Sequence, residues 1–294
     1  MSLPPGVRLS AGRGGLSRLE VETPLAHAEV YLQGAHVAAY ALRASGPLLF
    51  LSRASRFAVG APIRGGVPLV FPWFGRKADD DAAPLHGPAR CLPWSLERAT
   101  VAAPGAVELT LALASGPAAM GWPAGATLRY RVEIGAALAL TLEIENRGPT
   151  PIRFEDALHT YLAVADVTRI RVSGLEGATF LDEADGFARK QGGAGPLLLR
   201  GETDRVYDDT RATCVVWDPG AQRRVEIAKT GSDATIVWNP GPDGVRAFPD
   251  LGADEWREFV CVESGNVGRG AVTVPPGGRH ELSVRIQSAP WRGA

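Results

Sequence analysis

The sequence predicts an all-β protein in which residues 1–294 form a single domain, a large antiparallel β-sandwich. Three observations support this prediction. Apolar and polar residues alternate with a period of two in many short segments, as in strands that bury one face. The 35 glycines and 23 prolines are spread along the chain between these segments, which is typical of many short strands joined by turns. No long helix is indicated, and no break in composition marks a second domain.

The predicted strands follow one another from one end of the chain to the other. The clearest pair, residues 127–134 and 138–145, is joined by Gly135-Ala136, which we predict to be a tight hairpin turn. Residues 78–81 and 191–195 are acidic or glycine-rich and are predicted to be exposed loops. The other predicted strands are residues 19–23, 28–32, 36–40, 107–111, 214–217, 224–228, 234–238 and 281–286.

The bulk composition excludes several classes of function. The chain has 31 basic and 32 acidic residues and a formal net charge of -1, which argues against binding to nucleic acid. No apolar run is long enough to cross a bilayer, and the N-terminal residues lack the pattern of a signal peptide. We therefore expect a cytoplasmic protein without a membrane partner. Cys91, Cys214 and Cys261 are far apart and form no CxxC pair, so neither a disulfide framework nor a cysteine-rich zinc site is indicated.

The segment 259–267 contains one carboxylate among apolar residues. If the segment is extended, Phe259, Cys261 and Glu263 share one face, and both faces of the strand are expected to be at least partly buried. Three interpretations of Glu263 are open from the residues alone. The carboxylate pairs with a cation, lies exposed at the end of the strand, or is held in a cleft with a shifted pKa for proton transfer.

The histidines limit where further chemistry can lie. We interpret His27, His36 and His280 as structural or solvent-facing. His86 lies in an irregular segment, and loops often carry function. His159 shares a face with Tyr161 if its segment is a strand.

Residues 63–75 surround Arg64 with glycine, proline and aromatic side chains. Two interpretations of this segment are open. A Gly-Gly pair allows the backbone to approach a ligand, and aromatic faces suit a sugar ring; the segment is equally consistent with an aromatic plug at one end of the sandwich. Nucleotide-binding, serine hydrolase and HExxH motifs are absent. A histidine and a glutamate without such motifs favour acid–base chemistry.

Six short motifs, taken together, resemble one family. In chain order they are Ile63–Gly75, His86–Arg90, His159–Leu162, Thr203–Tyr207, Val237–Pro240 and Cys261–Val267. These motifs resemble those of the hexose-6-phosphate mutarotases, the glucose-6-phosphate 1-epimerase branch of the aldose 1-epimerase family, and they span nearly the whole chain.

The resemblance implies a galactose-mutarotase-like β-supersandwich that interconverts the α and β anomers of a hexose 6-phosphate. It implies no metal and no cofactor, a small-molecule substrate and a monomer. Two alternatives remain: an aldose 1-epimerase acting on free hexoses, or a sugar-phosphate binding protein without catalytic activity. By motif, the implied roles are general acid for His159, general base for Glu263, orientation of the sugar and its ring oxygen for His86, binding of sugar hydroxyls for Asp204, and binding of the phosphate for Arg64 and Arg90.

Overall fold

The structure is a computed structural model that describes residues 2–78 and 80–291. Within these residues the chain is nearly all β, as predicted, and every strand pairs with its neighbours in the antiparallel sense. The only α-helix of the described part is α1 (Gly241–Gly244), a single turn. None of the helices found there has the length and apolar character needed to cross a membrane. The 3-10 turns are Arg13–Gly15, Ala89–Cys91, Ala118–Met120, Glu183–Asp185, Val245–Ala247, Glu255–Glu258 and Gly268–Gly270.

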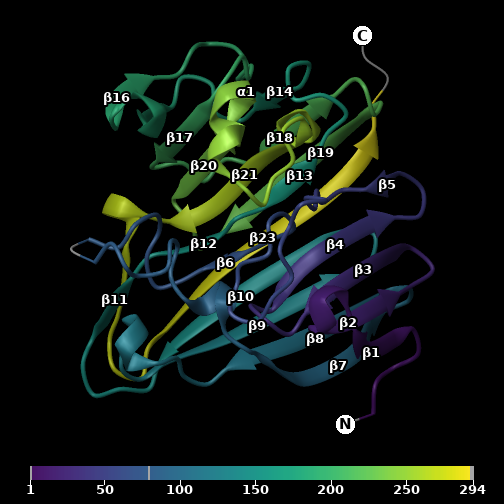
Figure 1. The fold of residues 1–294 in the computed structure, drawn as a ribbon, viewed down its shortest axis with the longest axis vertical. Helices are drawn as coiled ribbons and strands as arrows, with labels where there is room; N and C mark the ends of the chain where they lie inside the picture. Colours follow the sequence, from purple (N-terminus) through teal and green to yellow (C-terminus); the bar gives the residue numbers. More distant parts are fainter. Residues whose placement is uncertain (1, 79, 292–294) are drawn as a thin grey trace.

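The strands form three larger sheets and one small one (Figure 1). In spatial order, the first sheet contains β1 (Val7–Ala11), β2 (Ser17–Glu22), β3 (Ala26–Tyr31), β4 (His36–Leu42) and β5 (Gly46–Pro47). The second contains β14 (Arg171–Ser173), β18 (Cys214–Asp218), β19 (Arg223–Thr230), β23 (Arg279–Pro290), β10 (Leu138–Asn146), β9 (Ala126–Ile134), β8 (Ala106–Leu113) and β7 (Ser95–Ala103). The third contains β16 (Ala188–Gln191), β15 (Thr179–Asp182), β17 (Thr203–Asp208), β20 (Ala234–Asn239), β21 (Phe259–Asn266), β12 (Asp156–Leu158) and β6 (Leu69–Val70), and β13 (Tyr161–Ala163) also pairs with β21. The small sheet pairs β11 (Ile152–Phe154) with β22 (Val272–Val274).

The first and third sheets together form one layer of the sandwich. Antiparallel bridges between Val37 and Val67 and between Leu49 and Leu162 connect them. In Figure 1 this layer lies over the long second sheet, and side chains of all three sheets share one buried core. The Tyr40 hydroxyl of β4 also donates a hydrogen bond of 2.8 Å to the Gly135 carbonyl, which lies in the turn between β9 and β10 of the second sheet. The predicted sandwich is therefore confirmed.

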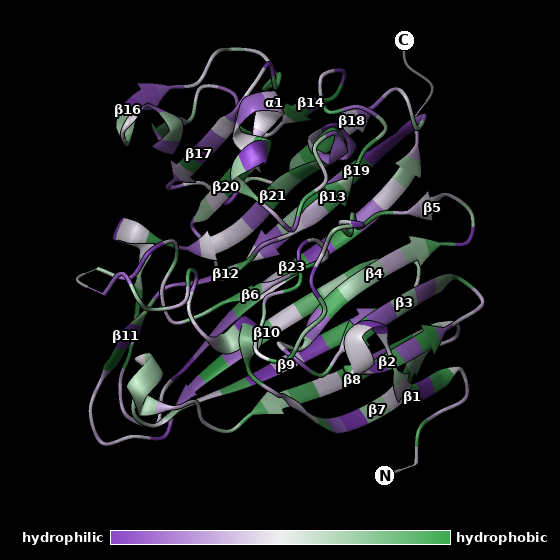
Figure 2. Cartoon of the chain, viewed as in Figure 1, coloured by the Kyte–Doolittle hydropathy of each residue, from purple (hydrophilic) through white to green (hydrophobic). Residues whose placement is uncertain are grey.

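The period-two pattern explains the central hairpin of β9 and β10. Buried and partly exposed residues alternate without a break along both strands, and Figure 2 shows the same banding in hydropathy. Each leucine that moves from water into the core contributes about 1.5 to 3 kcal/mol. The turn between the strands has one residue more than predicted, because Ile134 pairs with Leu138.

Strand β21 has the opposite pattern, because all eight of its residues are buried. This confirms the prediction that both faces of the segment are covered. Gly265 allows the close approach of β12, since a Cβ atom there would lie 2.6 Å from the Asp156 carbonyl oxygen and 2.7 Å from the Ala157 Cβ. Glu263 is thus buried within the third sheet and does not lie at an exposed strand end.

The glycine pair of the segment 63–75 has a packing role. Gly65 has a φ of 112°, and a Cβ there would lie 2.5 Å from the carbonyl oxygen of Phe50. Gly66 has a φ of 62°, and a Cβ there would lie 2.2 Å from the carbonyl oxygen of Val37. Both positions require glycine because a side chain there would collide with the backbone of other segments of the protein.

The two predicted loops are found where expected, with small differences. Asp79 lies outside the described residues, while Ala78 and Asp81 on either side of it are exposed. Gln191 is the last residue of β16, so the second loop starts one residue later than predicted.

Candidate active site

A row of side chains crosses one end of the third sheet. In the pairing register, Asp204 of β17 lies opposite Trp238 of β20, Trp238 lies opposite Cys261 of β21, and Cys261 lies opposite Tyr161 of β13. Directly opposed residues of antiparallel strands point to the same face of the sheet. Glu263 lies two residues after Cys261 and therefore shares this face.

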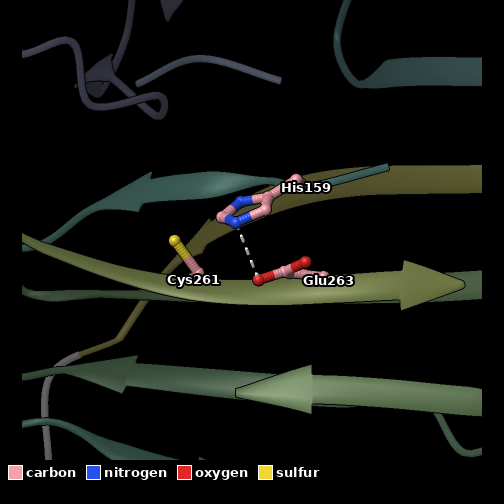
Figure 3. Close-up of side chains that lie close together, drawn as sticks. All are labelled: His159, Cys261 and Glu263. Atoms are coloured by element: carbon pink, nitrogen blue, oxygen red, sulfur yellow. Dashed lines mark ion pairs between the residues drawn. The ribbon is translucent and has the colours of Figure 1, made fainter. Parts of the chain in front are cut away.

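The predicted general acid and general base are in contact in the structure. The distance from His159 Nε2 to Glu263 Oε1 is 3.2 Å, and the two side chains are 8% and 1% exposed (Figure 3). His159 lies between β12 and β13 and not within a strand. The prediction that His159 shares a face with Tyr161 assumed a strand at this position and therefore does not apply. The connection between two short strands places the imidazole above β21.

Aromatic rings hold His159 in place. Its ring stacks on Tyr161 with centroids 4.9 Å apart and an angle of 16°. The rings of His86 and Trp238 approach it edge-on, at 5.5 Å and 6.1 Å. The backbone N–H of His159 donates to the Pro68 carbonyl at 3.1 Å. These contacts fix the direction in which the imidazole nitrogens point.

His86 has a fixed ring and an unusual backbone. Its φ of 61° lies in the left-handed region, which is uncommon for residues other than glycine and often marks a functional position. The Gly75 N–H donates to His86 Nδ1 at 3.0 Å. Because Nδ1 accepts this bond, the neutral ring carries its proton on Nε2. His86 is thus prepared to donate a hydrogen bond from Nε2.

Burial controls the charge of the His159–Glu263 pair. It raises the pKa of Glu263 well above its ordinary value, and the neighbouring carboxylate of Asp204 acts in the same direction. Burial also lowers the pKa of His159 to about 3, with Arg90 and Arg64 adding to the effect. In the absence of a ligand, burial therefore favours the uncharged form of both groups. Transfer of one proton from Glu263 to His159 would give a carboxylate and an imidazolium without changing the net charge of the pair.

Asp204 lies on the same face, among other acids. Burial raises its pKa from 3.8 to about 7, and the carboxylates of Glu183, Glu202 and Asp182 contribute to this shift. A carboxyl group with such a pKa is poised to both accept and donate hydrogen bonds near neutral pH.

The two predicted arginines differ in how closely they approach the pair. Arg64 Nη1 donates to the Tyr161 hydroxyl at 3.1 Å, and Arg64 Nε lies 3.2 Å from Asp250 Oδ1. Although burial opposes the charge, Tyr161 and Asp250 keep the pKa of Arg64 above its ordinary value. Arg90 Nη2 donates to the Leu85 carbonyl at 2.6 Å, and burial lowers its pKa. The positive charge of Arg90 adds to the lowering of the pKa of His159 and partly offsets the rise in the pKa of Glu263.

The remaining histidines lie elsewhere. His27 Nδ1 is 2.8 Å from Glu22, and His280 Nε2 is 3.3 Å from the buried Asp156. His36 is buried, and burial lowers its pKa to about 3. These positions are consistent with the structural or solvent-facing roles predicted from the sequence.

Three residues of this neighbourhood received no role in the sequence analysis. Tyr161 links Arg64 to His159, and Trp238 forms part of the aromatic wall. Both belong to recognised motifs, so a signal was present. Asp250, the ion-pair partner of Arg64, lies in a segment with no motif, and only the fold brings it to this position.

Comparison with known proteins agrees with this geometry. The model of the aldose 1-epimerase family matches residues 17–287. The chain belongs to the aldose 1-epimerase family. Members of this family are isomerases, so the chain is classed as an enzyme, as predicted.

Two relatives of this protein are provisionally named glucose-6-phosphate 1-epimerase. The one from Salmonella typhimurium is 34% identical over 250 residues, which cover 85% of this chain and 83% of the relative. The one from Cenchrus ciliaris is 30% identical over 274 residues, which cover 90% of this chain and 82% of the relative. Both matches extend across most of the two chains compared.

Solved structures of similar proteins have the same fold. The crystal structure of a Salmonella typhimurium protein provisionally named mutarotase, YeaD, has a TM-score of 0.91 and 30% identity, covering 98% of this chain and 95% of that one. A galactose mutarotase-like protein from Clostridium acetobutylicum has a TM-score of 0.71 at 11% identity, covering 97% and 98%. At that identity the likeness concerns the fold alone. The predicted galactose-mutarotase-like architecture is therefore confirmed.

Proposed function

We propose that this enzyme is a mutarotase that interconverts the α and β anomers of a hexose 6-phosphate, with glucose 6-phosphate as the first candidate. The observation that carries the proposal is the contact of 3.2 Å between His159 Nε2 and Glu263 Oε1 in a buried site. The names of the relatives from Salmonella typhimurium and Cenchrus ciliaris support the choice of sugar.

The chemistry requires one acid and one base at the same carbon atom. Glu263 takes the proton of the C1 hydroxyl while His159 gives a proton to the ring oxygen, and the C1–O5 bond breaks. The open aldehyde turns about the C1–C2 bond, and the two groups reverse their roles as the ring closes on the other face. The hydroxyl oxygen and the ring oxygen are both bonded to C1 and are therefore close together. Glu263 and His159, which are in contact with each other, can thus reach one oxygen each. Each proton transfer is expected to accelerate the reaction about 10²- to 10⁴-fold.

The protonation of the pair fits this reaction. A proton moved from Glu263 to His159 creates both the base and the acid at no change in net charge. The negative charge of a bound phosphate would favour the imidazolium form of His159. Asp204 binds sugar hydroxyls from β17, two strands away from Glu263 in the sheet, and His86 donates to the sugar through Nε2.

The arginines provide the phosphate site in this proposal. The planar guanidinium groups can bind phosphate oxygens in pairs and keep their charge. Arg64 supports this assignment because its Nη1 is directed to Tyr161, which stacks on His159. Arg90 adds positive charge, since its field reaches both His159 and His86.

The decisive experiment follows anomerisation directly. Crystalline α-glucose 6-phosphate is dissolved, and the approach to equilibrium is measured by NMR at several enzyme concentrations. We expect a first-order rate that rises in proportion to enzyme above the spontaneous rate. A rate independent of enzyme concentration for this sugar, and for the 6-phosphates of mannose and galactose, would refute the proposal.

A free hexose is the second candidate substrate, and one observation favours it. Asp250 lies 3.2 Å from Arg64 and compensates part of the charge that a phosphate would use. The same NMR assay with α-glucose separates the two candidates. A larger kcat/KM for glucose than for its 6-phosphate would identify a free-sugar epimerase, and binding of either sugar without acceleration would identify a binding protein.

We further propose that the enzyme acts as a monomer in the cytoplasm. One chain supplies all the proposed catalytic and binding residues, so the site needs no second copy. Phosphorylated hexoses are charged metabolites that do not diffuse through membranes, which supports the location. Light scattering coupled to size exclusion should give a mass near 31.0 kDa.

A further inference from the structure

The catalytic pair has a third neighbour that the proposed reaction does not use. Cys261 projects from β21 on the same side as Glu263 and faces the ring of His159 (Figure 3). One ligand atom from each of His159, Cys261 and Glu263 lies within 4.8 Å of the others, and all three residues are buried. An imidazole, a thiol and a carboxyl group that converge in this way are the ligand types that zinc prefers.

We propose that His159, Cys261 and Glu263 form an inhibitory binding site for Zn²⁺ in which the metal occupies the acid and the base at the same time. The statement about metal binding is independent of the proposed function, whereas the statement about inhibition rests on it. The metal is a ligand that blocks the site and has no part in the reaction.

The carboxylate of Glu263 has free bonding capacity at this site. Although Glu263 Oε1 lies 3.2 Å from His159 Nε2, neither carboxylate oxygen of this buried residue has a hydrogen-bond partner among the described residues. Buried polar atoms without a partner are uncommon in folded proteins. A metal ion would bind a carboxylate oxygen of Glu263 and one imidazole nitrogen of His159.

The distances require only a small contraction. In a tetrahedral zinc site with bonds of about 2.0 to 2.3 Å, the ligand atoms lie about 3.3 to 3.7 Å apart. The Nε2–Oε1 distance of 3.2 Å is already close to this range, and the largest separation in the group is 4.8 Å at most. A rotation of the Cys261 or Glu263 side chain would bring the third atom into range, and water would take the fourth position.

The charge balance also favours the metal. A thiolate and a carboxylate together carry two negative charges, which Zn²⁺ neutralises, so the loaded site has no net charge to bury. Asp204 lies in the same cross-strand row as Cys261, and its negative charge would attract a cation. The positive charges of Arg64 and Arg90 oppose binding.

The test uses Cys261→Ser and Cys261→Ala, with Cys214→Ala as the matched control, because Cys214 is an equally buried free cysteine on β18. Metal-free protein is titrated with Zn²⁺ alone in a calorimeter, without sugar. We expect one equivalent to bind to the wild type and to Cys214→Ala. Removing a ligand should weaken binding at least about 100-fold, since even the loss of a supporting contact costs 10- to 100-fold. Co²⁺ in the same site should show a sulfur-to-metal charge-transfer band that disappears in Cys261→Ser.

Activity gives the second measurement. Zinc should abolish anomerisation by the wild type and by Cys214→Ala, a chelator should restore it, and Cys261→Ser should remain active at the same zinc concentration. Zinc affinity that is equal in the wild type and Cys261→Ser, or no stoichiometric binding by the wild type, would overturn the metal site. Zinc that binds through Cys261 without slowing the reaction would overturn the inhibition. An enzyme without activity in zinc-free buffer would refute the proposed function and leave the calorimetric result intact.

Discussion

Replacing Asp204 with asparagine tests how strongly the site is isolated from water. Burial and the carboxylates of Glu183, Glu202 and Asp182 raise the pKa of Asp204 from 3.8 to about 7. Asparagine has nearly the same shape and does not ionise. The substitution therefore removes the titration of this position and keeps most of its packing.

The sign of the effect follows from proton linkage. Asp204 has a higher pKa in the folded state than in the unfolded state, so between about pH 4 and 7 the folded protein holds a proton that the unfolded chain has lost. Stability is consequently lost as the pH rises through this window. For a pKa raised from 3.8 to about 7, the loss between pH 5 and 8 is about 2 to 3 kcal/mol. Asp204→Asn should avoid this loss.

Urea denaturation at pH 5 and pH 8 measures the difference. Relative to the wild type, the free energy of unfolding of Asp204→Asn should increase by about 2 to 3 kcal/mol between the two pH values. For a chain of 294 residues this corresponds to about 4 °C in Tm. Asp208→Asn on the same strand is the control, because hydrogen bonds from Arg189 lower the pKa of Asp208. Its effect should be the same at pH 5 and pH 8, since both lie above the unfolded pKa. If the wild type and Asp204→Asn lose equal stability between these pH values, the carboxyl group titrates in its usual range and the burial argument is wrong.

Three further predictions concern catalysis, substrate choice and packing. Glu263→Gln and His159→Asn should each lower kcat in the NMR assay by about 10²-fold or more, because each removes one proton-transfer group; a folded variant with a near-normal rate would reject the role of that residue. Arg64→Ala should raise KM for glucose 6-phosphate about 10-fold or more, the value of a charged hydrogen bond, and leave KM for glucose nearly unchanged. An equal rise for both sugars would remove the phosphate assignment of Arg64. Gly265→Ala should destabilise the protein by about 1 to 3 kcal/mol in urea, because its Cβ would meet Asp156 and Ala157 of β12 at 2.6 and 2.7 Å. Gly193→Ala is the control, since nothing lies within 4 Å of a Cβ there, and equal stability of the two variants would contradict the packing argument.

The strands could be predicted because their signal is local. Alternation along β9 and β10 depends on side chains that point to opposite faces, and it survives whatever the strands pair with. The position of His159 was harder to predict from the sequence. It lies between β12 and β13, which have only three residues each, and such short strands leave no periodic pattern. The glycines at 65 and 66 were recognised as special, but the sequence does not indicate which strands they approach.

Some residues of the site could be predicted from the sequence, and others could not. His159 and Glu263 were candidates because their motifs resemble those of a known family, and the family itself is confirmed by the match to residues 17–287. Their roles remain proposals. Asp250 could not be found, because its only reason to matter is an ion pair with Arg64, which is far from it in the chain.

The sequence by itself determined the class of fold, the positions of the most regular strands and the residue types available for acid–base chemistry. Only the tertiary structure decided that His159 and Glu263 touch, that Cys261 joins them, and that Asp204 has a pKa of about 7. The physical reason is that distance, burial and local charge depend on the pairing register of strands that are remote in the chain. A carboxyl group in β21 has its ordinary pKa in the unfolded chain and acquires a different one only when β12, β17 and β20 pack around it.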